Sequence, residues 1–406
     1  MPERVVRLYK NYQLSNSLLV WLPIFYLYQR ESGLSDGQIF GIQAIYYVAF
    51  CLLDVPTGMI ADRYDYRRFL QAGAALLTLA NLVPVFFPSY WGFLTHFMII
   101  ALAYSFTSGA GSAYVYEYLH RSGADHAYRQ AEGSARAYAL IGRVVCLPAA
   151  GVLMQWEPTA PYWLSAVATT AAFVVALRFP KLPPGTVHHE NASVAQAWNV
   201  LRRAPLLALI MVQGVAIFTL ARILQANLFQ PVLDAKHLPV AWFGVLMAAT
   251  QLFEAAGAAR PGLLRRRVSD LGAVFGLTVI MAVCLAFIVP AGIAGTIACL
   301  CVFSLATGLS FPVQRQLMND AISDPRTRAT LLSAESLIDR AVCSGAIFVL
   351  GSYLSAGAMN TFLVHAAITT VVLMIAIAVL IKWVRLRQGD HLRRHREASS
   401  EPDQQR

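Results

Sequence analysis

The sequence GMIADRYDYRR, from Gly58 to Arg68, lies between two apolar runs of about 20 residues each. An apolar run of that length spans a bilayer as one helix, so the stretch is predicted to join two membrane helices by a tight turn. Gly58 allows the two helices to approach closely, and three arginines and two aspartates keep the turn in water. Because Lys and Arg accumulate in cytoplasmic loops, this turn is predicted to face the cytoplasm.

The composition is that of a membrane protein. Of the 406 residues, 57% are hydrophobic and only 13% are charged, whereas soluble domains carry roughly 25% charged residues. The net charge of +10 could indicate nucleic-acid binding, but about 26 of the 32 Lys and Arg fall on one predicted side of the membrane. We interpret this as the positive-inside pattern and expect no nucleic-acid partner.

Twelve apolar spans can be drawn along the chain, so an all-α integral membrane protein is predicted. Their approximate limits are 9–29, 37–60, 69–87, 91–118, 129–155, 160–179, 205–229, 240–260, 271–290, 294–318, 328–355 and 358–384. An even number of spans places both termini on the same side, and we expect that side to be the cytoplasmic face of the cell membrane.

The longest interior link, residues 181–204, divides the chain into two predicted six-helix bundles, 1–180 and 205–385. It is interpreted as a cytoplasmic interdomain loop. Residues 386–406 are highly charged and are predicted to form a disordered cytoplasmic tail.

The two bundles are interpreted as a repeat. At an offset of 199 residues, Gly58 matches Gly257 and Arg67 matches Arg266, at equivalent places in the topology. Parallel six-helix repeats imply two pseudo-symmetric bundles that rock about a central binding site.

This layout resembles the major facilitator superfamily (MFS), whose members are built from such repeats. The residues that carry the resemblance are Gly58, Asp62, Arg63, Arg67 and Arg68, which fit that family's loop between helices 2 and 3. The resemblance covers nearly the whole chain and implies the MFS fold and secondary transport.

The same resemblance implies a conformational gate, formed by Gly58, Asp62, Arg63, Arg67, Arg68 and Glu117. Asp62 would meet the start of helix 11, and Arg63 or Arg67 would reach Glu117 at the end of helix 4. This latch would hold the cytoplasmic side shut. The alternative is ordinary interfacial charge that aids topology.

Charged residues deep in the spans are rare, because a charge at the bilayer centre costs on the order of 3 kcal/mol. The candidate proton-coupling residues are Asp54, Glu254, Asp339 and His96. Arg143 and Arg222 could hold an anionic part of the cargo. The alternative is structural ion pairing, in which Asp339 would pair with its neighbour Arg340.

The candidate substrate cavity combines polar residues of helices 1, 4, 7 and 10, which line the cavity in the resembled family, with the two deep arginines. Its members are Asn16, Trp21, Tyr104, Ser108, Arg143, Gln213, Arg222, Gln225, Ser304 and Thr307. That mixture suits a small amphipathic organic molecule, although each residue could also serve packing alone.

No P-loop, HExxH or GxSxG motif occurs, so no catalytic residue, metal or cofactor is predicted and an enzyme is not expected. The leading hypothesis is a transporter that exports a small amphipathic compound in exchange for protons, and we expect it to be a monomer. The alternatives are an importer or uniporter of an organic anion or metabolite, a membrane-embedded enzyme, and a non-transporting sensor.

Overall fold

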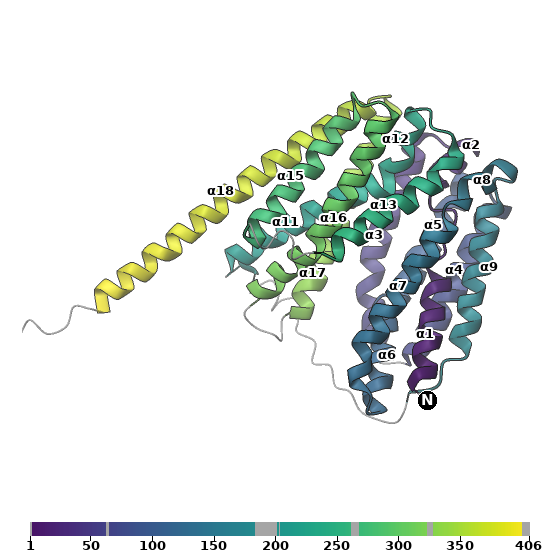
Figure 1. The fold of residues 1–406 in the computed structure, drawn as a ribbon, viewed down its shortest axis with the longest axis horizontal. Helices are drawn as coiled ribbons and strands as arrows, with labels where there is room; N and C mark the ends of the chain where they lie inside the picture. Colours follow the sequence, from purple (N-terminus) through teal and green to yellow (C-terminus); the bar gives the residue numbers. More distant parts are fainter. Residues whose placement is uncertain are drawn as a thin grey trace, which may run out of the picture.

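The computed structural model describes six stretches of the chain: residues 2–61, 65–182, 201–202, 204–260, 268–322 and 328–399. Within them the elements are helices alone. They run between two ends of the molecule, the N-terminal end, where α1 begins, and the opposite end, called here the far end (Figure 1).

The first group of helices extends to residue 177. It contains α1 (Pro2–Asn16), α2 (Phe25–Glu31), α3 (Asp36–Ala61), α4 (Tyr66–Phe86), α5 (Tyr90–Thr107), α6 (Ala110–Arg121), η1 (Asp125–Ala127), α7 (Tyr128–Cys146), α8 (Ala149–Trp156) and α9 (Ala160–Leu177).

The second group of helices begins at Pro205. It contains α11 (Pro205–Arg222), the π-helix η2 (Ile223–Leu228), α12 (Phe229–Ala235), η3 (Val240–Trp242), α13 (Phe243–Ala258), α15 (Asp270–Ile288), α16 (Ile293–Ala321), α17 (Arg328–Ser355) and α18 (Met359–Ser399).

Among the described residues, ten segments are long and apolar enough to cross a membrane, or eleven when α7 and α8, bent by 44°, count as one. The remaining expected span, 9–29, is divided into α1 and α2. Pro23 lies in the interruption, where it cannot donate a helical hydrogen bond. The all-helical membrane fold is therefore confirmed, with the first span broken.

Another expected span, 91–118, bends between α5 and α6. Gly109 at the break has φ +77°, a left-handed conformation that favours glycine. The preceding residue, Ser108, is exposed at the end of α5.

The two groups share one hydrophobic core at the far end and have separate cores toward the N-terminal end. The largest cluster of buried apolar side chains includes Phe40 and Phe93 of the first group and Phe243 and Phe303 of the second. A second cluster, around Tyr12, contains residues of the first group alone, and a third contains residues of the second group alone. Figure 1 shows the same arrangement, with the groups meeting above and leaning apart below.

Glycines allow the backbones of the two groups to touch at the far end. A Cβ atom on Gly244 of α13 would lie 1.9 Å from the carbonyl oxygen of Leu147, and one on Gly151 of α8 would lie 2.0 Å from that of Val240. Real Cβ atoms do not approach so closely, so this contact depends on the absence of side chains.

Polar contacts join the groups at the same end. The Tyr26 amide donates to Gln230 Oε1 at 2.9 Å, and Gln230 Nε2 donates to the Leu22 carbonyl at 3.0 Å. Arg30 and Asp234 form an ion pair of 2.8 Å at the surface. On another side of the molecule α3 packs along α17, where Ser344 Oγ donates to the Ala44 carbonyl.

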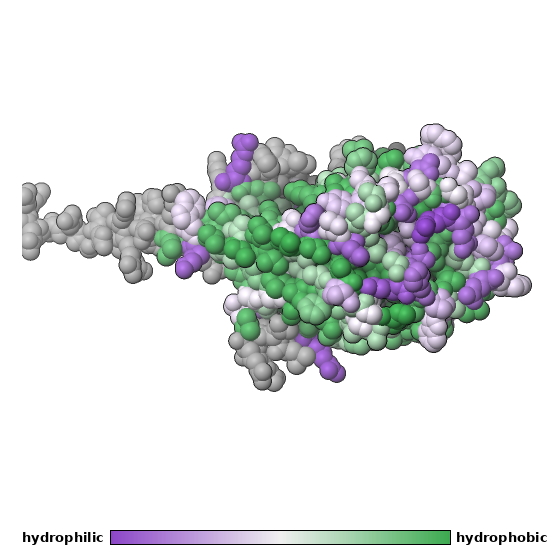
Figure 2. Space-filling view, turned by 90° about the horizontal axis from the view of Figure 1, so that it is seen from above, coloured by the Kyte–Doolittle hydropathy of each residue, from purple (hydrophilic) through white to green (hydrophobic). Residues whose placement is uncertain are grey.

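The outer surface is apolar along the helices. Val372, Ile375 and Val379 of α18 are each about 60% exposed, as expected for side chains that face lipid. Figure 2, which views the far end, shows hydrophobic surface over α18 and hydrophilic residues gathered where Figure 1 places α2 and α8.

Helix α18 continues to Ser399, into the segment expected to form the tail, and residues 400–406 lie outside the described part. The disordered tail of residues 386–406 stays a prediction. Residues 386–399 include four arginines, which are good helix formers, and they extend a helix that is already nucleated.

Candidate functional site

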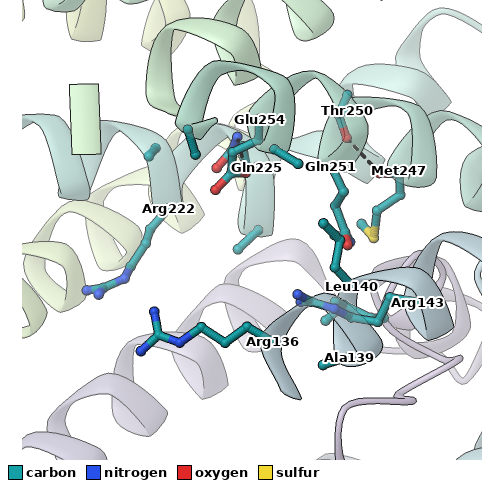
Figure 3. Close-up of a pocket in the computed structure, with 15 residues that line it drawn as sticks. Arg136, Ala139, Leu140, Arg143, Arg222, Gln225, Met247, Thr250, Gln251 and Glu254 are labelled. Atoms are coloured by element: carbon teal, nitrogen blue, oxygen red, sulfur yellow. Dashed lines mark hydrogen bonds between the residues drawn. The ribbon is translucent and has the colours of Figure 1, made fainter. Parts of the chain in front are cut away.

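A cavity of about 520 Å³ lies between the two groups, below their far-end contact. Its walls come from α7 on one side and from α11, η2 and α13 on the other (Figure 3). Leu22, from the break in the first span, also lines it. The volume suits a small organic molecule.

The α7 wall carries two arginines, Arg136 and Arg143. They are seven residues apart, which places them on one face of the helix and about 10 Å apart along its axis. Figure 3 shows both side chains extending into the space between the walls. Their surroundings differ. Arg136 is 77% exposed and pairs with Glu132, one turn earlier, at 3.1 Å.

Arg143 has no such partner. Its Nε is buried without a hydrogen bond, and no carboxylate among the described residues forms an ion pair with its guanidinium. A partly buried cation that forms no direct ion pair gains free energy from an anion that binds beside it. On the α7 wall, Arg143 is therefore the arginine that forms no ion pair with a described carboxylate, whereas Arg136 is paired with Glu132.

The opposite wall presents a carboxylate held by an amide. Gln225 Nε2 donates to Glu254 Oε2 at 3.2 Å and to Ser304 Oγ at 3.1 Å. Gln225 belongs to the π-helix η2, whose wider turn is closed by Asn227 Nδ2 donating to the Arg222 carbonyl at 3.0 Å. Single π-turns inside α-helices often occur at functional sites.

The second deep arginine is paired. Arg222 forms an ion pair with Asp339 of α17, and Thr219 Oγ1 donates to the same carboxylate at 3.3 Å. In Figure 3 the Arg222 side chain points away from Arg143. Because Asp339 belongs to the second group, the charge of Arg222 is neutralised within that group.

The expected pairing of Asp339 with Arg340 is wrong. Arg340 instead pairs with Asp54 of α3 at 2.8 Å, across the contact between the groups. Neighbouring residues on a helix point about 100° apart, so these two side chains reach different helices.

One buried pair was missed by sequence reasoning. Glu335 of α17 is 1% exposed and pairs with Arg315 of α16 at 3.1 Å. Its position four residues before Asp339, on the same helix face, was the available signal.

His96, a predicted proton-coupling residue, lies away from the cavity. It is fully buried, and its Nδ1 is 2.6 Å from the Ala80 carbonyl oxygen. Its ring lies 5.0 Å from Trp21 and 5.7 Å from Tyr162, between ring centroids. Trp21 in turn donates to Asn81 at 2.7 Å, so both predicted residues lie among buried side chains of the first group, outside the cavity lining.

Of the predicted site residues, the structure brings Arg143, Arg222, Gln225 and Glu254 together around the cavity. Ser304 reaches it through Gln225. The other predicted cavity residues lie outside its lining: Asn16, Trp21, Tyr104, Ser108, Gln213 and Thr307. Sequence reasoning missed Gln251 and Met247, which only the packing of α13 against α7 brings to the cavity.

Two of the predicted gate residues, Asp62 and Arg63, lie outside the described residues. Gly58 is in the last turns of α3, and Arg68 is exposed in the first turn of α4. The latch that these residues would form stays a prediction.

Arg67 and Glu117 each have a nearer partner. Arg67 Nε lies 3.5 Å from Asp65, and its Nη1 donates to the Phe179 carbonyl at 3.3 Å. Glu117 pairs with Arg121, one turn later on α6. These contacts hold both side chains at the N-terminal end of the first group.

The family model described as Major Facilitator Superfamily matches residues 12–338. No curated protein matches the chain.

Solved structures of similar fold include the nucleoside transporter NupG. It has a TM-score of 0.71 at 15% identity, over 94% of this chain and 99% of that one. A mutant of the same transporter gives a TM-score of 0.77 at 13% identity, over 93% and 99%. The POT family transporter PepTSo gives 0.72 at 11% identity, over 95% and 99%. The family match and the all-helical fold of the described residues together show that the chain belongs to the Major Facilitator Superfamily and is a multi-pass membrane transporter rather than an enzyme.

Proposed function

We propose that the chain is a secondary transporter of a small organic anion, which binds in the 520 Å³ cavity. The observation that carries the proposal is the guanidinium of Arg143, which lies in the cavity without a carboxylate partner among the described residues. The negative group of the cargo would bind Arg143, and its apolar part would contact Leu22, Leu140 and Met247.

Alternating access would proceed by rocking of residues 1–180 against residues 205–385. The groups share a core at the far end and separate toward the N-terminal end. If the basic N-terminal end lies on the cytoplasmic side of the cell membrane, this arrangement of the two groups is an inward-facing conformation. The latch at Asp62 would then form in the opposite conformation, with the protein working as a monomer.

Glu254 offers a site for a coupling proton. Its carboxylate shares the cavity with Arg143, so an anionic cargo and an ionised Glu254 compete for the same positive charge. Protonation of Glu254 would remove this competition and strengthen cargo binding. By linkage, cargo and proton would then travel together, which favours uptake of the anion over exchange.

Proton-coupled export of an amphipathic compound is the second candidate. The mostly apolar lining around Leu140 and Met247 favours it. A neutral or cationic cargo would bind Glu254 in its ionised form, so cargo and proton would compete and be exchanged.

Transport into proteoliposomes tests the proposal, with a panel of carboxylates and their neutral amide counterparts and an imposed pH gradient. For wild-type protein we expect the carboxylates to be preferred. Arg143→Gln should lower kcat/KM for the anion about 30-fold, the equivalent of about 2 kcal/mol for a lost charge-assisted hydrogen bond, and should abolish the preference.

Arg178→Gln is the matched control, because Arg178 is an exposed arginine at the end of α9 outside the cavity. Arg143→Lys should retain part of the preference, since it keeps the charge. Equal transport of anion and neutral counterpart by the wild type, or an unchanged preference in Arg143→Gln, contradicts an anionic cargo.

A further inference from the structure

A second cavity, of about 830 Å³, lies between α1 and α7 at the N-terminal end. It is on a different face of α7 from the central cavity. Gln130, Ser134 and Tyr138 line it at intervals of four residues, whereas Arg136 and Arg143 line the central one. Ser134 and Arg136 point about 160° apart on a helix of 3.6 residues per turn. This lateral groove therefore opens away from the transport path.

The lateral groove is basic. Arg7 and Lys10, one turn apart on α1, line it together with His126 of η1. Among the described residues that line the groove, Glu3 alone is acidic. Lys10 Nζ lies 5.6 Å from the centre of the Tyr138 ring. Neither Arg7 nor Lys10 forms an ion pair with a described carboxylate. Two cations thus remain available for an anionic group.

The groove continues into an apolar stripe. Beyond Tyr138, the same face of α7 presents Ile141 and Val145, which are 60% and 70% exposed. The spacing of three and four residues aligns these side chains along the helix, in the direction of the membrane span. In a membrane protein such exposed apolar side chains contact acyl chains.

We propose that the lateral groove binds an anionic phospholipid. Its phosphate lies between Arg7 and Lys10, polar groups of the headgroup and glycerol reach Gln130 and Ser134, and an acyl chain follows the stripe to Val145. A soluble anion would gain binding free energy from the two cations alone. Because the cationic groove runs directly into exposed apolar surface, the structure matches a molecule with a charged head and a hydrocarbon tail.

Native mass spectrometry of the purified protein with phosphatidylglycerol or phosphatidylcholine tests this inference. The wild type should retain phosphatidylglycerol preferentially. The double variant Arg7→Gln/Lys10→Gln should bind phosphatidylglycerol about 30-fold more weakly. Each basic side chain near the lipid surface contributes on the order of fivefold in affinity. Arg4→Gln/Arg178→Gln removes the same net charge from residues outside the groove and should bind as the wild type does.

A photoreactive phosphatidylglycerol with the label in its acyl chain gives an independent readout on the unmodified protein. Cross-links should concentrate on the α7 segment from Tyr138 to Val145. Equal retention of the two lipids, equal loss in both double variants, or cross-links spread over other helices would overturn the inference. Displacement of the lipid by inorganic phosphate at equal concentration would also overturn it, since it would show that the tail contributes nothing.

Discussion

Arg143 and Arg222 are both arginines inside predicted membrane spans, yet the structure gives them opposite surroundings. Arg222 is neutralised by Asp339 within the second group, whereas Arg143 faces the cavity and forms no ion pair with a carboxylate of the described residues. The sequence shows two equivalent deep charges. The two arginines differ because a different helix packs opposite each of them.

The comparison separates structural charge from charge available to a ligand. A buried ion pair is costly to break, because the remaining partner is left without compensation in a low-dielectric environment. A cation that has no internal partner can be removed with little loss of stability, but any anion it binds is then lost. Stability and transport should therefore respond in opposite ways at the two sites.

The largest effect is expected at the paired site. Asp339 is 1% exposed, so Asp339→Asn should leave Arg222 uncompensated and lower the free energy of unfolding by about 3 kcal/mol. Thermal or denaturant unfolding in a fixed detergent measures it. Arg143→Gln, the matched variant, should change stability by less than about 0.5 kcal/mol.

The double variant Arg222→Gln/Asp339→Asn sharpens this test. It removes both charges, so it should recover part of the stability lost in Asp339→Asn. A double variant that is as unstable as the sum of its two single variants would show that the ion pair contributes no coupling free energy.

An intermediate effect is expected at Glu254, on the wall opposite Arg143. Glu254→Gln removes the competing negative charge, so anion binding at high pH should become about fivefold tighter, for about 1 kcal/mol of repulsion. Accumulation driven by a pH gradient should disappear, because no proton is then carried at this site. Cargo binding measured between pH 5 and pH 9 checks the first, and transport into proteoliposomes under an imposed pH gradient checks the second. A pH dependence equal to that of the wild type would exclude Glu254 as the coupling group.

The smallest effect is expected at the surface pair of Arg30 and Asp234, whose side chains are 48% and 41% exposed. Solvent screens such a pair, so Asp234→Asn should change the unfolding free energy by about 0.5 kcal/mol or less. The same unfolding assay measures it. A loss above about 1.5 kcal/mol would mean that the far-end contact depends on this pair rather than on the backbone contacts at Gly151 and Gly244.

Much of the architecture could be predicted from the sequence. Apart from the first span, which is broken, the predicted span limits lie close to those of single helices or bent pairs, because length and hydropathy decide which segments cross a bilayer. Individual side-chain partners could not be predicted. Asp339 and Arg340 are adjacent in sequence, but helix geometry sends them to Arg222 and Asp54 on different helices.

The sequence by itself determined the membrane class, the helical secondary structure and the family, because hydrophobic runs and charge asymmetry act locally along the chain. It also identified Arg143, Arg222 and Glu254 as costly charges that require an explanation. Only the tertiary structure decided which of these charges are paired and which face the cavity. The physical reason is that a charge inside the membrane is assigned its partner by the helix packed opposite it, and that helix can lie more than a hundred residues away in the sequence.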